Sequence, residues 1–234
     1  MLVTKLEEVL ELAYKKKGAE FVYSTCAELL KIKDKSNKKP IVNGEVCETL
    51  LLFLTKTYIK ERGIKGNYVR GLVLKDPQHP DSDYRTEIDF VFYTPQIIFC
   101  FECKSYAGHK VITDKGLLDN GRYQCDIYSQ NSTHAKILHR NIYKFKGIKY
   151  QSQNKYHIAM GAFFFSQGDI EDLRDTKSKT VLPIITQETL YNFYDTILRS
   201  NATPVWDYAK VNLFLQTLAN NTALREEHKR YLQY

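Results

Sequence analysis

The sequence lacks any hydrophobic run that could cross a membrane. Its longest apolar runs, such as Ala159–Phe165, are far shorter than the roughly 20 residues that a spanning helix needs. The N-terminus carries Glu7, Glu8 and Glu11 among its apolar residues, which excludes a secretory signal. We therefore expect a protein that has no membrane partner.

Cysteine is also scarce, and its pattern excludes a disulfide framework. The chain has five cysteines, an odd number without framework spacing, which is typical of reduced thiols in the cytoplasm. Cys100 and Cys103 have Cys-x-x-Cys spacing, but residues three apart on a strand point to opposite faces. They are poorly placed to share a zinc ion. We expect a cytoplasmic protein without structural zinc.

The chain does have a globular composition with a basic surplus. Its 234 residues, 43% hydrophobic and 26% charged, suit one domain with an extension or two small domains. The net charge of +7 and the pI near 9.0 favour a polyanionic partner such as a nucleic acid.

Basic residues gather in two stretches. These are Lys31, Lys33, Lys35, Lys38 and Lys39, and further on Lys136, His139, Arg140, Lys144, Lys146 and Lys149. The second stretch lies on a predicted helix that also carries Gln130. We predict that Lys136, Arg140 and Lys144 contact nucleic-acid phosphates. The alternative is that both stretches are solvated surface.

The segment Arg85–Lys104 organises the rest of the chain. Its β-branched and aromatic residues predict two strands joined by the loop Thr94–Ile97, because Pro95 cannot adopt the positive φ of a tight primed turn. That loop sets the register across the hairpin. One face is then wholly apolar, with the pairs Phe92 and Phe99, Phe90 and Phe101, and Ile88 and Cys103. The other face has the pairs Tyr93 and Ile98, Val91 and Cys100, Asp89 and Glu102, and Glu87 and Lys104.

Two carboxylates therefore face each other across the hairpin. Asp89 and Glu102 would have Cβ atoms about 5 Å apart and repel each other, which a bound divalent cation would relieve. The alternative is a solvated sheet face on which Lys104 neutralises Glu87 and Glu102. Apolar neighbours on the same face indicate that the charges lie at the edge of a covered face, in a cleft.

These strands resemble a known family. Asp89, followed on the next strand by Glu102-Cys103-Lys104, resembles the Asp…Glu-x-Lys signature of the PD-(D/E)xK nuclease superfamily. The wider pattern resembles the nuclease-related domain called NERD. It comprises Glu87–Phe92, a proline-containing turn, Ile98–Lys104, and Tyr106-Ala107-Gly108, with Gly44-Glu45 upstream and Gln130 and His134 downstream. The resemblance covers roughly residues 42–145.

The resemblance implies a metal-dependent nuclease acting on DNA. Carboxylate oxygens suit Mg²⁺ or Mn²⁺, so Asp89 and Glu102 are the candidate ligands, and the resemblance adds the main-chain carbonyl of Cys103. Lys104 would orient the attacking water and offset developing negative charge. Gln130 would brace the water or the phosphate. The family is often fused to helicase, kinase or zinc-ribbon modules, so this chain is expected to need a separate protein partner for targeting.

Two further candidates stay open. Glu45 gains its place in the site from the resemblance, with Glu48 as its rival, whereas acidic residues near a helix N-terminus need no catalytic role. For His134, a helix-surface or capping role is favoured over catalysis.

The order of the predicted elements gives an α/β fold class. We expect a restriction-endonuclease-like αβββαβ core, with a mixed central sheet flanked by helices. The predicted helices span residues 2–17, 20–32, 44–60, 126–145, 189–199, 206–218 and 222–231, the predicted strands 68–75, 85–93, 98–104, 109–113, 157–165 and 181–185, and a loop 114–122. We divide the chain into a helical N-terminal appendage (1–40), the nuclease-like domain (41–185) and a helical C-terminal extension (186–234).

Overall fold

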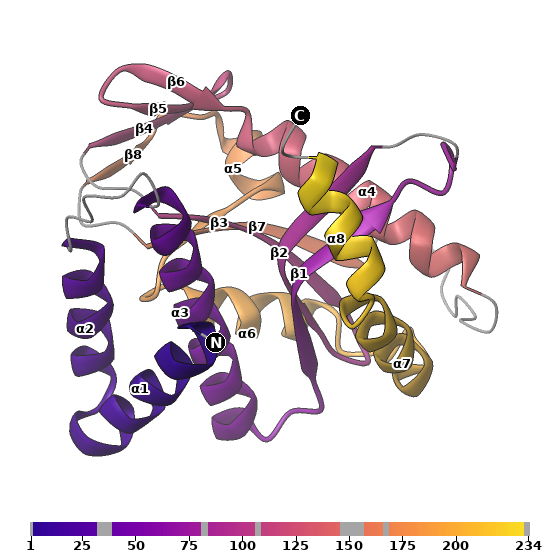
Figure 1. Cartoon of the computed structure of the whole chain (residues 1–234), viewed down its shortest axis with the longest axis horizontal. Coiled ribbons are helices and arrows are strands. Elements are labelled where there is room, and N and C mark those ends of the chain that lie inside the picture. Colours follow the sequence, from indigo (N-terminus) through magenta and orange to yellow (C-terminus); the bar gives the residue numbers. More distant parts are fainter. Residues whose placement is uncertain are drawn as a thin grey trace. The chain divides into compact units, whose positions relative to one another are not determined.

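The computed structural model of the chain describes residues 2–31, 39–80, 84–105, 109–145, 157–165 and 169–231 (Figure 1). They form two compact units. Unit 1 comprises Met1–Arg62, Cys103–Ile127 and Ala162–Thr189, and unit 2 comprises Gly63–Glu102, Tyr128–Gly161 and Leu190–Tyr234. The division at residues 40 and 185 stays a prediction. Over the described ranges, we find no helix that is both long and apolar enough to cross a membrane.

The main sheet is mixed, as predicted. Its strand order is β1 (Asn67–Lys75), β2 (Arg85–Tyr93), β3 (Ile98–Lys104), β7 (Ile158–Phe164) and β9 (Ile184–Ile185). The first three strands are antiparallel neighbours, whereas β7 and β9 run parallel. The helix α3 (Lys39–Arg62) precedes β1, and α4 (Ile127–Lys144) precedes β7. The predicted αβββαβ order is therefore present, with three short strands of a second sheet inserted between β3 and α4.

The register predicted for the β2–β3 hairpin is confirmed over four residue pairs. They are Phe90 and Phe101, Val91 and Cys100, Phe92 and Phe99, and Tyr93 and Ile98. The loop closes through the main-chain N–H of Thr94, which donates to the Ile97 carbonyl at 2.9 Å. The Thr94 hydroxyl in turn accepts the N–H of Ile97 at 3.1 Å. A four-residue loop thus fixes the alignment, as the proline required.

Both faces of this hairpin are buried in unit 2. On one face, α6 (Leu190–Ser200) brings Tyr194 against Phe92 and Phe99, with ring centroids 5.0 Å apart in both pairs. On the other face, a buried cluster joins the hairpin to α4 and α7 (Tyr208–Ala219). Its members include Val91, Cys100, Ile137, Leu138, Val211 and Leu215. Edge-to-face aromatic contacts on one side and aliphatic packing on the other hold the hairpin in place.

The ladder between β1 and β2 is interrupted at Asp89. Arg70 is opposite Phe90 and Leu72 is opposite Ile88, so the register is the same on both sides of the interruption. Gly71, which lies between these two pairs on β1, has a φ of 53°. Ile88 belongs to the same buried cluster as Val91. Its predicted place on the phenylalanine face stays a prediction.

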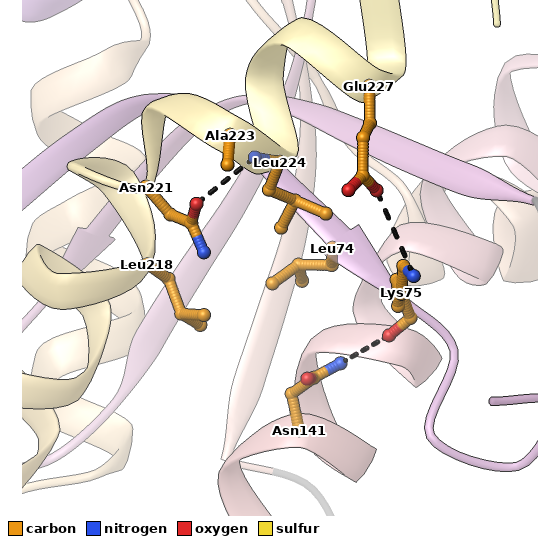
Figure 2. Close-up of a pocket in the computed structure, with 8 residues that line it drawn as sticks. All are labelled: Leu74, Lys75, Asn141, Leu218, Asn221, Ala223, Leu224 and Glu227. Carbon is orange, nitrogen blue, oxygen red and sulfur yellow. Dashed lines mark hydrogen bonds and ion pairs between the residues drawn. The ribbon is translucent and has the colours of Figure 1, made fainter.

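The C-terminal helices cover the outer edge of β1 in unit 2. Figure 1 shows α7 and α8 (Thr222–Tyr231) alongside this strand. Gln216 donates to the Tyr68 carbonyl at 3.0 Å, and Arg225 donates to the Arg70 carbonyl at 3.3 Å. These side chains satisfy edge carbonyls that could otherwise pair with another strand. Beneath α8 lies a hollow of about 340 Å³, lined by Leu74, Lys75, Asn141, Leu218, Asn221, Ala223, Leu224 and Glu227 (Figure 2).

Unit 1 contains three N-terminal helices: α1 (Leu2–Lys17), α2 (Ala19–Lys31) and α3. Gly18, with a φ of 78°, ends α1 as predicted. The predicted start of α3 at residue 44 is wrong, because the helix already begins at Lys39. Its residue Cys47 donates from Sγ to the Lys104 carbonyl at 3.5 Å. This contact seats α3 on the end of β3 within unit 1.

The loop predicted over residues 114–122 is wrong. Unit 1 has a second sheet, in the order β6 (Arg122–Cys125), β5 (Gly116–Asp119), β4 (Lys110–Thr113) and β8 (Ile170–Asp172), followed by α5 (Thr176–Val181). Asn120 and Gly121 have φ values of 49° and 76° and join β5 to β6 as a two-residue hairpin turn. Asn-Gly is the strongest short hairpin signal, but strands of four residues with little apolar alternation concealed it.

Candidate active site

Unit 2 holds a buried carboxylate between a strand and a helix. Glu102, on β3, is 2% exposed. Gln130 Nε2 donates to Glu102 Oε1 at 2.7 Å, and His134 Nδ1 lies 3.4 Å from Glu102 Oε2. Both partners come from α4, where residues four apart share one face. The next residue, Asn131, donates to the Gly161 carbonyl at 2.9 Å and fixes the helix against β7.

His134 is one residue whose position the sequence did not reveal. The favoured helix-surface or capping role is wrong, because His134 is 5% exposed and faces Glu102. Its spacing of four from Gln130 was the available signal, since both side chains then lie on the same face of α4. Burial of that face could not be derived from the spacing alone.

Asp89 lies on the neighbouring strand and is half-buried. Asp89 precedes Phe90 on β2 and Glu102 follows Phe101 on β3, so the two carboxylates come directly beyond the paired residues Phe90 and Phe101. Burial raises the pKa of the Cys100 thiol, and the negative charges of Glu102 and Asp89 raise it further. Unit 2 therefore brings Asp89, Glu102, Gln130 and His134 into one region.

Glu87 makes contacts on the side of β2 away from β3. It is opposite Val73 on β1. Its carboxylate lies 3.2 Å from His228 Nε2 on α8. Its predicted place opposite Lys104 across the hairpin stays a prediction.

The remaining candidates belong to unit 1. Cys103 is 9% exposed, and Lys104 is half-buried. The Lys104 carbonyl accepts the Phe165 N–H at 3.1 Å, which fixes this end of β3 against the end of β7. Glu45 is half-buried on α3, two residues before Cys47. Along β3, Lys104 and Glu102 are two residues apart and so point to the same side of the strand.

Sequence comparison identifies a known domain in part of the chain. The family model of the nuclease-related domain matches residues 48–160. Residues 48–160 form a nuclease-related domain. This NERD segment contains Asp89, Glu102, Cys103, Lys104 and Gln130, whereas Glu45 lies three residues before it.

Two further comparisons add little to the NERD assignment. No curated protein matches the chain. The crystal structure of protein VC1899 from Vibrio cholerae is similar over 86% of this chain, with 13% sequence identity and a TM-score of 0.43. The match covers 50% of that protein, so the chain spans half of its length.

Two of the three basic residues predicted to bind phosphates contact other residues of the NERD segment. Arg140 Nη1 donates to Asp76 Oδ2 at 2.7 Å, and Lys144 donates to the Pro77 carbonyl. Lys136 is exposed. Arg140 and Lys144 thus hold the loop after β1 against α4. Lys33, Lys35, Lys38, Lys146, Lys149 and the segment Tyr106-Ala107-Gly108 lie outside the described residues.

The donor set of the NERD segment fits a hard divalent cation. Within the described ranges, no group of three or more His, Cys, Asp and Glu side chains could hold a metal. Mg²⁺, however, is usually bound by one or two carboxylates and keeps several waters. Asp89 and Glu102 supply two carboxylates. An ionised carboxylate offers about four lone-pair directions, so the contacts of Glu102 with Gln130 and His134 leave room for a metal.

Proposed function

We propose that this chain is a Mg²⁺-dependent nuclease that hydrolyses phosphodiester bonds of DNA. The observation that supports it best is the buried carboxylate of Glu102, held by Gln130 and His134 beside Asp89 within a NERD segment. Removing a carboxylate from water is costly unless it is compensated, so a chain that buries one needs a reason to keep it. Ligation of a cation is such a reason.

In this proposal, Asp89, Glu102 and the Cys103 carbonyl hold Mg²⁺ or Mn²⁺. A metal held there would lower the pKa of a coordinated water and polarise the scissile phosphate. Gln130 donates to Glu102 Oε1 and so fixes the direction of the other carboxylate oxygen. Lys104, on the same side of β3 as Glu102, orients the attacking water and offsets the charge that develops on the phosphate. Glu45 acts in an outer shell.

The test combines a substrate panel with one variant. Purified chain is incubated with labelled single- and double-stranded DNA and RNA in Mg²⁺, Mn²⁺ or EDTA. We expect metal-dependent cleavage of DNA and a loss of at least about a hundredfold in rate for Lys104→Ala, with most of the DNA affinity retained. Undiminished turnover in Lys104→Ala would exclude the proposed role of the lysine. Cleavage that persists in EDTA would exclude the metal.

The second candidate is a non-catalytic nucleic-acid-binding or partner-recruiting subunit that keeps the nuclease fold. The observation in its favour is that the described side chains include no metal-binding group of three or more acidic, histidine or cysteine residues. If the chain binds DNA but cleaves none of the substrates with either metal, this candidate is correct. A separate protein partner that directs the chain to its substrate fits both candidates.

A further inference from the structure

The hollow beneath α8 in unit 2 has an apolar floor. Leu74 on β1 is buried, and Leu218 on α7 and Leu224 on α8 are half-buried; all three line the hollow (Figure 2). Its volume of about 340 Å³ is within the range of small-molecule sites, roughly 300–1,000 Å³. The floor is therefore suited to cover an apolar group of a small ligand.

Two amides that line the hollow have orientations fixed by the fold. Asn141 Nδ2 donates to the Lys75 carbonyl and to the Ile137 carbonyl, both at 2.9 Å. Both amide hydrogens of Asn141 are used, so the group that it offers to the hollow is its oxygen. Asn221 is the reverse, because its Oδ1 accepts the Leu224 N–H at 3.0 Å and its amide nitrogen lies on the side of the hollow (Figure 2). The hollow thus presents one fixed acceptor and one fixed donor.

The charges around the hollow leave a cation available. Glu227 Oε2 lies 3.0 Å from Arg85 Nη2 and 3.9 Å from Lys75 Nζ. Arg85 is the closer of the two and is buried, whereas the Lys75 side chain is 45% exposed. An ion pair as long and as exposed as that of Lys75 contributes little to stability. The Lys75 ammonium can therefore bind an anionic ligand group without the loss of a strong contact.

These features together define the chemistry of a ligand. The Lys75 ammonium and the Asn221 N–H suit a carboxylate, since both are donors and one is charged. The Asn141 oxygen suits an N–H group of the same ligand, and the leucine floor suits an apolar side chain. The Glu227 carboxylate, which also lines the hollow, disfavours a doubly charged phosphate. A carboxylate, an N–H group and an apolar side chain occur together in an apolar amino acid.

We propose that the hollow beneath α8 binds an apolar amino acid through its free carboxylate. Lys75 Nζ and Asn221 Nδ2 hold the carboxylate, and Asn141 Oδ1 accepts a hydrogen bond from the ligand nitrogen. This chemistry has two sources, a free amino acid and the C-terminal residue of a peptide. Asn141 is 11 residues after Gln130 on α4, roughly 16 Å along the helix, so the ligand leaves the candidate active site open. The inference therefore does not depend on the proposed nuclease function.

The first test uses four small probes and the full chain. Isothermal titration calorimetry compares L-leucine, N-acetyl-L-leucine, N-acetylglycine and L-leucinamide. At least one of the two leucine acids should bind with a Kd of about 1 mM or tighter. N-acetylglycine lacks the apolar side chain and L-leucinamide lacks the carboxylate, so each should bind at least about tenfold more weakly than the better leucine acid.

The same titrations distinguish the two sources. Tighter binding of L-leucine identifies a free amino acid as the ligand, because its ammonium is retained. Tighter binding of N-acetyl-L-leucine identifies the C-terminal residue of a peptide, because the acetyl group mimics the preceding peptide bond. If neither acid binds at millimolar concentration, or if L-leucinamide or N-acetylglycine binds equally well, the proposal is overturned.

Asn221→Asp separates ligand binding from the stability of α8. Aspartate keeps an oxygen that accepts the Leu224 N–H, so the start of α8 stays capped and the Tm should be nearly unchanged. The donor to the ligand is replaced by a second oxygen, so the affinity for the leucine acid should fall at least about tenfold. Wild-type affinity in Asn221→Asp contradicts the proposed contact.

A pair of lysine variants tests the charge. Lys75→Gln should weaken binding about threefold to fivefold, which is the range expected for an exposed ion pair. Lys210→Gln on α7 is the matched control, because Lys210 is 48% exposed, contacts Asp207 at 3.5 Å and does not line the hollow. It should bind the ligand as the wild type does. Equal affinities of the two lysine variants would show that Lys75 does not hold the carboxylate and would overturn the proposed site.

Discussion

Unit 2 contains two polar clusters that differ in which partner is buried. In the first, which we call the acid cluster, Glu102 is buried with Gln130 and His134. The second, the α8 clamp, comprises Arg85, Glu87, Glu227 and His228. In the clamp the basic side chains are buried, at 5% and 7% exposed, while both carboxylates are 44% exposed.

The difference shows what each cluster is suited to. A carboxylate that keeps much of its hydration loses little free energy of solvation. The clamp can therefore attach a polar helix to the sheet with a small desolvation cost. A carboxylate at 3% exposure loses its hydration, and in the acid cluster its shortest hydrogen bond comes from a neutral amide. Such an arrangement stabilises the fold poorly but suits a cation ligand. The two clusters should therefore respond differently to metal, acid and salt.

The largest expected effect is on the acid cluster. Mg²⁺ or Mn²⁺ bound only to the folded state should stabilise it by about 2.7 kcal/mol when the free metal is one hundred times its Kd. The Tm should rise with either metal, and Asp89→Asn should remove that response. The same substitution should raise the Tm of the metal-free protein, because it relieves repulsion between Asp89 and Glu102. Thermal unfolding with and without metal measures both changes.

The matched control for this prediction is Glu87→Gln in the α8 clamp, which should keep the full metal response. NaCl at equal ionic strength should leave the Tm of the wild type nearly unchanged. A wild type that ignores both metals, together with a destabilised Asp89→Asn, would show that the carboxylates are satisfied within the protein. The contrast between the two clusters would then disappear.

A smaller effect is expected for Asp76, which lies between the two extremes. Its side chain is 11% exposed, and that of its partner Arg140 is 32% exposed. Burial alone would raise the pKa of Asp76, but the Gln78 N–H, the His79 ring and the Arg140 guanidinium together lower it below the usual 3.8. Because the folded state has the lower pKa, the ionised form stabilises it at higher pH, and this contribution is lost as the pH falls below about 3.8.

Asp76→Asn should therefore cost about 1.5 kcal/mol of unfolding free energy near neutral pH, and the difference from wild type should shrink under acid conditions. Urea unfolding at several pH values measures it. Arg140→Gln should cost less, since Gln78 and His79 still hold the carboxylate. An Arg140→Gln variant that keeps its stability but loses DNA affinity would place Arg140 with the phosphate contacts instead.

The sequence predicted the elements that depend on local chemistry. The Thr94–Ile97 loop follows from the conformational limits of Pro95, and four rungs of the hairpin register follow from the loop. The end of α1 follows from Gly18. These features needed no information about distant residues, which is why the order of helices and strands in the core was also predicted correctly.

Features that depend on residues far apart in the sequence were not predictable. The contact of Glu87 with His228 requires α8 to lie on β1, and no pattern near Glu87 indicates this. The interruption of the β1–β2 ladder at Asp89, where Gly71 on β1 has a φ of 53°, is not signalled by the sequence around Asp89 either. Likewise, the burial of His134 follows from the packing of α4 and not from its own neighbours. Long-range packing, rather than propensity, decided each of these positions.

The smallest expected effects belong to α8, where Asn221 and Glu227, which both line the hollow, allow a direct comparison. Asn221, at the hollow in Figure 2, accepts the Leu224 N–H at 3.0 Å at the start of α8, so Asn221→Ala should cost about 1 kcal/mol at any salt concentration. Glu227 contacts Arg85 at 3.0 Å and Lys75 at 3.9 Å.

Glu227→Gln should cost only about 0.5 kcal/mol, and the loss should vanish at high NaCl, because the carboxylate of an exposed ion pair is screened. Urea unfolding of both variants at low and high NaCl separates the two contributions. If Glu227→Gln costs more than Asn221→Ala and its effect survives salt, the charges of the clamp behave as buried ones. The α8 clamp would then resemble the acid cluster, and exposure of the carboxylate would no longer distinguish a cluster that holds a helix from one suited to a metal.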